Sequence, residues 1–200
     1  FSKSSQISTI RGATGDYSHA EGLKTIASGE KSHTEGEYSI ASGETSHAEG
    51  YETEASGQYS HAEGEYTIAN KVTSHAEGFG TEASGNSSHA EGFSNFARSS
   101  GEHSGGRYGT DYTPQNNNTD RLLNYGNGSS NVNRSDVFTI FKNGAVRFFR
   151  ENILNINNTN KEGFLIFNSA DSNRPYIHNG TNWKGLAYKD ELGSGGGSIS

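Results

Sequence analysis

Large apolar side chains are distributed unevenly along this chain of 200 residues. Leu, Ile, Val and Phe account for 8 of the 94 residues in the range 13–106, and for 17 of the 56 residues in the range 137–192. A break of this size marks a boundary between two differently built regions. The first region holds too few large apolar residues for a conventional core, so we expect its order to come from repetition.

The first region repeats every 14 residues. Histidines recur at this spacing, and six of them stand in the string Ser-His-Ala-Glu-Gly or in its variant with Thr in place of Ala. A related string, Thr-Ile-Ala-Ser-Gly at residues 25–29, falls halfway between them, so glycine recurs every seven residues except at Lys71 and Ser99. We assign turns to the recurring glycines, which are Gly22, Gly29, Gly36, Gly43, Gly50, Gly57, Gly64, Gly78, Gly85 and Gly92.

A seven-residue period is also that of the coiled coil, but the residues here exclude a helix. One glycine in every seven residues costs a helix about 1 kcal/mol each time, and the β-branched Thr and Ile lower the helix propensity further. A short strand followed by a glycine turn fits the pattern, with two strands in each 14-residue coil. Coils stacked at about 4.8 Å then pair strand to strand, which predicts a parallel β-roll of roughly six to seven coils.

Strand alternation assigns the side chains of each coil to an inside and an outside. Ser or Thr and Ala share one face of each strand, and their small size predicts a narrow interior. His and Glu share the opposite face of one strand and point outward. The outward face of the other strand varies between apolar and charged residues, as at Ile26, Glu54 and Phe96, which is typical of solvent-exposed surface.

The repeated His and Glu residues indicate a regular partner, most simply symmetry-related copies of the same chain. A roll with an interior of Ala and Ser is thin, so we expect oligomerisation with these side chains at the axis and His of one subunit paired to Glu of the next. The alternative is that His and Glu form solvated ladders along the roll. We call these residues the His/Glu ladder: His19, Glu21, His33, Glu35, His47, Glu49, His61, Glu63, His75, Glu77, His89 and Glu91.

No catalytic constellation stands out in the sequence, and the glycine spacing matches no phosphate-binding motif. The chain has no Cys, which excludes disulfides and thiolate metal sites. A uniform ladder offers no distinguished position for three or four convergent ligands. We therefore expect no functional metal, no cofactor and no enzyme; an adventitious ion on the axis and a glycan depolymerase are the alternatives.

Aromatic residues follow the turn glycines in several coils. A row of tyrosines is suited to stacking on the sugar rings of a surface glycan, and the alternative is packing between neighbouring rolls or coils. The candidates for glycan contact are Tyr38, Tyr51, Tyr59 and Tyr66.

Charge and hydropathy exclude two classes of partner. The net charge is −7 and the pI is about 5.6, which argues against a nucleic-acid-binding surface. No apolar run approaches the roughly 18 residues of a membrane span, so we expect no membrane insertion.

The alternation of Ser-x-Ala-x-Gly and Ala-Ser-Gly on a 14-residue period resembles the YadA-like head repeat of trimeric autotransporter adhesins. The resemblance covers residues 12–106. It implies a left-handed parallel β-roll and a homotrimer in which three rolls pack around one axis. The chain carries His and Glu where members of that family commonly carry Val and Ile beside the central Ala, so the implied interface is polar.

The rest of the chain divides into a polar segment and a β-rich segment. β-Rich runs flank Asn143-Gly144 and precede Asn179-Gly180, which predicts hairpins and a meander, and residues 152–157 predict a further strand. The string Asn-Gly-Thr-Asn-Trp-Lys-Gly-Leu at residues 179–186 is similar to small β modules of bacteriophage tail fibres and appendages. The expected organisation is a lead-in over 1–12, the β-roll over 13–106, an Asn/Gly-rich connector over 107–135, the hairpin and meander module over 136–192, and a flexible Gly/Ser linker over 193–200.

Together these features predict an all-β, homotrimeric structural protein. We expect a rigid rod for host attachment in the virion, within a bacteriophage tail fibre or appendage. Its expected partners are other tail or baseplate proteins and a host surface receptor or glycan. The alternative is the head of a trimeric adhesin on the bacterial cell surface. The fibre-like string and the lack of a heptad stalk and a membrane barrel in the chain favour the virion.

Overall fold

The computed structural model describes residues 12–148, 150–151, 165–168, 174–178 and 183–185. The chain divides into two compact units, Phe1–Arg147 and Phe148–Ser200. Every regular element in the described part of the chain is a β-strand, and no helix there is long and apolar enough to cross a membrane. The expected lead-in up to residue 11, strand over 152–157 and linker over 193–200 lie outside the described residues.

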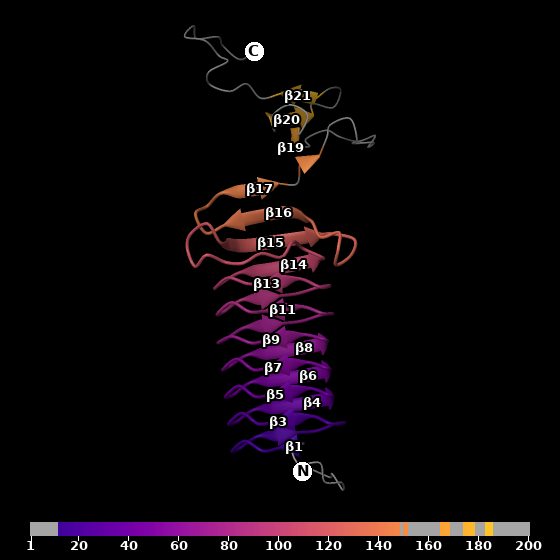
Figure 1. The fold of residues 1–200 in the computed structure, drawn as a ribbon, viewed down its shortest axis with the longest axis vertical. Coiled ribbons are helices and arrows are strands. Elements are labelled where there is room, and N and C mark those ends of the chain that lie inside the picture. Colours follow the sequence, from indigo (N-terminus) through magenta and orange to yellow (C-terminus); the bar gives the residue numbers. More distant parts are fainter. Residues whose placement is uncertain (1–11, 149, 152–164, 169–173, 179–182, 186–200) are drawn as a thin grey trace. The chain divides into compact units, whose positions relative to one another are not determined.

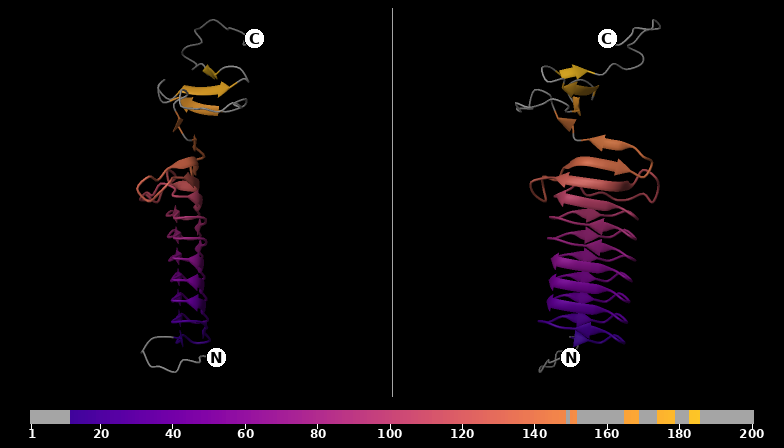
Figure 2. Two further views of the ribbon diagram at one scale, coloured as in Figure 1. Left: turned by 90° about the vertical axis from the view of Figure 1, so that its right-hand side faces the viewer. Right: turned by 180° about the vertical axis from the view of Figure 1, so that it is seen from behind.

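The first unit is built from 14-residue coils, each of which contributes one strand to each of two parallel sheets (Figure 1 and Figure 2). The smaller sheet contains, in spatial order, β1 (Gly12–Ala13), β3 (Ile26–Ala27), β5 (Ile40–Ala41), β7 (Glu54–Ala55), β9 (Ile68–Ala69), β11 (Glu82–Ala83) and β13 (Phe96–Ala97). The coils contribute to the larger sheet β2 (His19–Ala20), β4 (His33–Glu37), β6 (His47–Tyr51), β8 (His61–Glu65), β10 (His75–Ala76), β12 (His89–Ala90) and β14 (His103–Arg107). The predicted parallel β-roll with two strands in each coil is confirmed, with seven strands in each of these two sets.

Equivalent residues of successive coils lie opposite one another. His61 of β8 pairs in parallel register with His47 of β6 and with His75 of β10. The main chain donates from one coil to the next, as in the hydrogen bond from the N–H of His61 to the carbonyl oxygen of Ser74 at 3.0 Å. Because these bonds join coil to coil, the roll is ordered by its backbone with few large apolar side chains.

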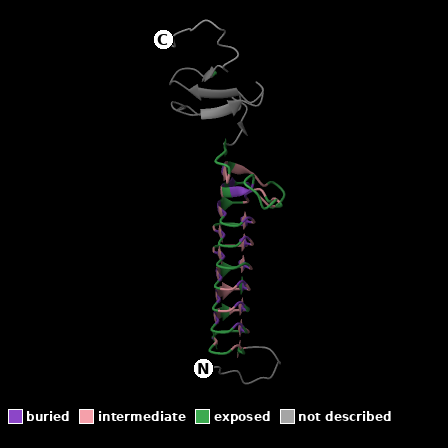
Figure 3. Cartoon of the chain, turned by 90° about the vertical axis from the view of Figure 1, so that its left-hand side faces the viewer, coloured by how far each residue is buried: buried purple, intermediate pink, exposed green. Residues whose placement is uncertain are grey.

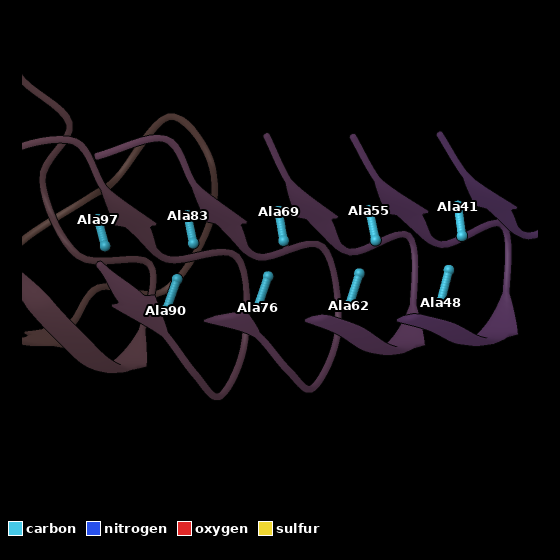
Figure 4. Close-up of a cluster of buried hydrophobic side chains, with 9 residues drawn as sticks. All are labelled: Ala41, Ala48, Ala55, Ala62, Ala69, Ala76, Ala83, Ala90 and Ala97. Atoms are coloured by element: carbon cyan, nitrogen blue, oxygen red, sulfur yellow. The ribbon is translucent and has the colours of Figure 1, made fainter. Parts of the chain in front are cut away.

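Two facing rows of alanine fill the centre of the roll (Figure 4). The serines and threonines beside them are also buried, and Figure 3 shows the buried residues following the roll from coil to coil. Ser60 illustrates a local role for the serines, since its Oγ donates to the carbonyl oxygen of Gly57 at 2.7 Å. The predicted narrow interior is therefore confirmed, and its continuous cluster consists of Ala41, Ala48, Ala55, Ala62, Ala69, Ala76, Ala83, Ala90 and Ala97.

The recurring glycines meet two different demands. Gly50 and its equivalents after each ladder glutamate have a left-handed backbone, with a φ of 115° at Gly50, a region that L side chains rarely adopt. Gly43 and its equivalents on the other side of the coil have no positive φ, but at both sets of glycines a side chain has no room. A Cβ on Gly43 would lie 2.0 Å from the carbonyl oxygen of Gly57 in the next coil.

A second left-handed position recurs every seven residues and is occupied mostly by residues other than glycine. Tyr38 has a φ of 60° and Glu52 a φ of 52°. The N–H of each donates to the carbonyl oxygen of the residue 15 positions earlier, Leu23 and Glu37 respectively, at 2.9 Å. This bond ties successive coils together at both edges of the roll. It offsets the cost of a left-handed L residue, which is about 1–2 kcal/mol.

The larger sheet continues beyond the coils. β15 (Arg121–Asn127) pairs parallel with β14 and antiparallel with β16 (Asp136–Phe141), and β17 (Val146–Phe148) lies next to β16. The buried side chains of Asn124 and Thr139 join β15 to β16 through a hydrogen bond of 2.8 Å. β15 falls within the range 107–135, where the polar composition predicts only a connector.

The second unit contains a four-stranded sheet. Its spatial order is β18 (Arg150–Glu151), β19 (Leu165–Asn168), β20 (Arg174–His178) and β21 (Trp183–Gly185). β18 pairs parallel with β19, whereas β19 with β20 and β20 with β21 are antiparallel. These strands lie in the part of the chain that is richer in large apolar residues.

Candidate functional site

The outward face of the larger sheet carries a column of seven imidazole rings, which the 14-residue register places one above another. Neighbouring rings from His33 to His89 are stacked, with centroids 4.7–4.8 Å apart and planes within 8° of each other. The end rings are tilted, by 55° between His19 and His33 and by 42° between His89 and His103. The histidines of the His/Glu ladder therefore form one continuous column along the chain.

Most imidazoles in the column have a carboxylate partner in the preceding coil. The distances from imidazole Nε2 to carboxylate Oε1 are 3.3 Å for His61–Glu49, 3.3 Å for His75–Glu63, 3.0 Å for His89–Glu77 and 3.2 Å for His103–Glu91. About a third of each of these side chains stays exposed. All four pairs lie within one chain, and pairing between subunits stays a prediction.

The first coils of the ladder depart from this pattern. His47 Nε2 is buried and has no hydrogen-bond partner among the described residues. His19 lies 3.8 Å from Glu21 of its own coil, not from a carboxylate of a neighbouring coil. A groove lined by Glu21, Glu35 and Glu49 runs beside these coils. The ladder is thus uniform in sequence but not in its contacts.

Two histidines of the column have a lowered pKa. Burial is the main cause for both. The charges of the adjacent His61 and His33 add to the lowering at His47, and those of His89 and His61 add to it at His75. The nearby carboxylates act in the opposite direction without cancelling these effects. Both imidazoles are therefore neutral at pH 7.

The ladder also gathers donor atoms into groups of three. In each group, one ligand atom from every residue lies within 4.8 Å of the other two. Imidazole nitrogen and carboxylate oxygen are ordinary ligands of divalent transition metals, so these groups are the part of the described chain suited to a metal. They are His47–Glu49–His61, His61–Glu63–His75, Glu21–His33–Glu35 and Glu77–His89–Glu91.

An aromatic row runs along one edge of the roll, beside the glycines that follow the ladder glutamates. Consecutive rings of the row are in contact, with centroids 4.6–6.0 Å apart. Tyr59, the remaining candidate for glycan contact, follows Gly57 at the opposite edge and is 52% exposed. The other three candidates for glycan contact, Tyr38, Tyr51 and Tyr66, lie in the row. The complete row consists of Tyr38, Tyr51, Tyr66, Phe79, Phe93 and Tyr108.

A buried carboxylate lies in the last coil. Glu102 stands where the preceding coils carry serine, and this substitution is the only sign of it in the sequence. Its Oε2 accepts from the N–H groups of Arg98 and Ser99, both at 2.8 Å, and from the Tyr112 hydroxyl at 3.1 Å. Burial raises the pKa of Glu102, although these hydrogen bonds and the charge of Arg121 oppose the shift.

A second polar cluster lies just beyond the last coil. The carboxylate of Asp136 in β16 accepts from the N–H of Thr110 at 2.7 Å, from Asn124 Nδ2 at 2.9 Å and from Arg147 at 2.8 Å. Arg121 lies 3.4 Å from the same carboxylate and is itself buried. The carboxylate of Asp136 is paired by these contacts, whereas Glu102 Oε1 has no hydrogen-bond partner among the described residues. Because both clusters join the last coil to the segments that follow it, we interpret them as the closing layer of the roll.

Comparison of the chain with protein-family models, with curated proteins and with solved structures found no match in any of the three. The function is therefore inferred from the geometry of the roll and its ladder.

Proposed function

We propose that this chain is a structural subunit of a homotrimeric fibre, in which the His/Glu ladder faces the axis. The observation that carries the proposal is the interior of the roll, where every buried apolar residue in the described coils is an alanine. Burial contributes about 0.8 kcal/mol per CH₂ group, so an alanine methyl adds far less than the side chain of Leu or Phe. A single roll gains little from its core, and a lateral partner supplies the missing burial.

The ladder face is the surface best suited to such a partner. Its stacked imidazoles form a flat, regular column, and about a third of each paired side chain is still available for burial. The outward face of the smaller sheet varies irregularly between apolar and charged residues, as at Ile40 and Glu54, and offers no such regularity. The aromatic row beside the ladder adds partly exposed apolar rings, including Tyr66 and Phe93.

The proposal includes the finer features implied by the resemblance to YadA-like head repeats. These are the left-handed sense of the roll, three rolls around one axis, and hairpin and meander modules beyond the coils. In this arrangement the roll is a stiff spacer, because its length is set by backbone ladders and not by flexible connections.

We place the fibre in a bacteriophage tail or appendage, with other tail or baseplate proteins and a host surface receptor or glycan as partners. The fibre-like string at residues 179–186 supports this location. The 14-residue repeat supports the alternative, the head of a bacterial surface adhesin. Labelling with an antibody against the chain separates the two, because it marks phage tails in the first case and the bacterial surface in the second. If the antibody labels neither structure, a role in host attachment is contradicted.

Native mass spectrometry of the full chain tests the trimer. We expect one species containing three chains, and a stable monomer would contradict the proposal.

Glu49→Arg with Glu63→Arg places three copies of each new charge near the axis and is expected to dissociate the trimer by like-charge repulsion. The matched control, Glu54→Arg with Ile68→Arg, places the same charges on the smaller sheet and leaves the trimer intact. Equal effects of the two pairs would show that the ladder is not at the axis.

A further inference from the structure

We propose that His47, Glu49 and His61 bind one divalent transition-metal ion. The donors are two imidazole nitrogens and one carboxylate oxygen, the combination that zinc uses in sites with an open fourth position. A uniform ladder favours no position for a metal, and on that ground the sequence predicts none. The contacts of the ladder are not uniform, however, and the departure lies at this cluster.

One edge of the site already has the required spacing. His61 Nε2 and Glu49 Oε1 are 3.3 Å apart. Donors bound to a tetrahedral zinc ion at about 2.0–2.2 Å are about 3.4 Å from each other. An ion can therefore replace the proton shared by this pair with little movement of either side chain.

His47 distinguishes this cluster from the others. In the coils that follow, each histidine Nε2 pairs with a glutamate of the preceding coil, whereas the buried His47 Nε2 has no partner in the described structure. A buried polar atom without a partner destabilises the fold, because it loses its hydrogen bonds to water and gains none in return. Binding an ion gives this nitrogen a partner, so His47 is the third ligand that the His61–Glu49 pair lacks.

One ring has to rotate for both nitrogens to reach the ion. The His47 and His61 rings are parallel to within 4° with centroids 4.8 Å apart, so their lone pairs point in nearly the same direction. His89 and His103 are also 4.8 Å apart but are tilted by 42°. A spacing of 4.8 Å between centroids therefore occurs with tilted as well as with parallel rings in this column.

The neighbouring donor groups explain why one ion is preferred. The group His61–Glu63–His75 shares His61 with the proposed site, so the two cannot be filled together. The remaining groups offer one imidazole and two carboxylates, a poorer set for zinc or copper, which favour nitrogen ligands. We therefore expect one tight ion for each chain.

Calorimetric titration of the full chain, freed of metal with a chelator, tests the proposal with zinc chloride. His47→Gln is expected to weaken binding by about tenfold or more, since even the loss of an outer-shell partner costs about 10–100-fold in metal affinity. Glu49→Gln, which removes a ligand of the same site, is expected to weaken binding equally. The matched control is His103→Gln, which changes a ring of the same column outside the donor group and is expected to shift affinity by less than about threefold.

Copper(II) provides a second readout, because its electron paramagnetic resonance spectrum reports the number of bound nitrogens. Two nitrogens are expected for the wild type and one for His47→Gln. No saturable binding, or equal weakening by His47→Gln and His103→Gln, would overturn the site and leave an adventitious ion only. All three ligands belong to one chain, so the outcome is independent of the proposed trimer.

Discussion

The interior threonines of the smaller sheet differ from coil to coil in whether the side-chain hydroxyl oxygen, Oγ1, has a hydrogen-bond partner. Thr53 Oγ1 donates to Ser39 Oγ at 2.9 Å. Thr67 occupies the same position one coil later, and its buried Oγ1 has no hydrogen-bond partner among the described residues. A buried hydroxyl of this kind costs about 1–3 kcal/mol, whereas a paired one contributes about 0.5–1.5 kcal/mol. The same substitution should therefore have opposite effects at the two positions.

We expect Thr67→Val to raise the free energy of unfolding by about 1 kcal/mol, because it replaces an unpaired hydroxyl with a methyl group of similar size. Thr53→Val is the matched control and should lower the free energy by about 1 kcal/mol through loss of its hydrogen bond. Urea denaturation measures both changes. Shifts of the same sign would show that the two hydroxyls have equivalent surroundings.

The sequence predicts residue positions where the same residue type returns. The interior alanines could be assigned because each stands at the same place in its half-coil. The left-handed position at Tyr38 and Glu52 could not be predicted from the sequence. Its occupants share no chemical property, and what they have in common is the backbone hydrogen bond to the preceding coil. The unpartnered nitrogen of His47 could not be predicted either, since His47 and His61 stand in identical pentapeptides.

The last coil of the roll is covered by the segments that follow it, and it carries a buried carboxylate. The last coil carries the buried Glu102 in place of the serine of earlier coils. The Tyr112 hydroxyl donates to its carboxylate, and the charge of Arg121 also acts on it. Burial raises the pKa of Tyr112 to about 12, and the charge of Glu102 acts in the same direction. Burial raises the pKa of Glu102 as well, so its ionised carboxylate is less stable here than in the unfolded chain, despite its hydrogen bonds.

The raised pKa of the buried Glu102 predicts that stability depends on pH. The folded state holds the proton of Glu102 more tightly than the unfolded chain does, so its contribution is lost as pH rises from the ordinary value of 4.5 through the raised pKa. Glu102→Gln should abolish this fall and make the protein more stable than the wild type at pH 8. The exposed Glu54→Gln is the control and should leave the pH profile unchanged. The midpoint of thermal unfolding, measured between pH 4 and pH 8, tests this prediction. Parallel pH profiles for the wild type and Glu102→Gln would contradict it.

Strand β15 shows why an element at this end was missing from the prediction. Residues 121–127 contain two adjacent leucines followed by polar residues and glycine, without the alternation that predicts a strand. The strand forms because β14 presents a free edge and because Asn124 pairs with Thr139 of β16. Both causes are tertiary, and neither is visible in the local sequence.

At the scale of the whole roll, each coil pairs only with the coil before it and the coil after it. The two edges are not equivalent, because glycines such as Gly64 have a positive φ while glycines such as Gly57 do not, although neither has room for a side chain. The structural unit is therefore the complete coil of 14 residues and not the half-coil of seven, even though both strands of a coil share the same interior pattern.

Deletions test this conclusion. Removing residues 65–78 joins Gly64 to Phe79 and reproduces the natural link between Gly78 and Phe79. We expect this chain to fold, with cooperative thermal unfolding close to that of the wild type. Removing residues 65–71 places the following histidine strand in the smaller sheet and interchanges the two kinds of glycine. We expect this second deletion to lower the midpoint of unfolding sharply, as measured by circular dichroism. Equal midpoints would mean that the half-coil is the unit.

The variable outward face of the smaller sheet has an evolutionary consequence. Isoleucine at Ile40, glutamate at Glu54 and isoleucine at Ile68 occupy the same register position in three successive strands, and the backbone there is unchanged. Mutation can alter these positions without disturbing the alanine interior or the glycines. Duplication of a coil copies both the scaffold and an unconstrained surface position, so a protein built this way can lengthen and acquire new recognition on one side while the ladder on the other side is inherited intact.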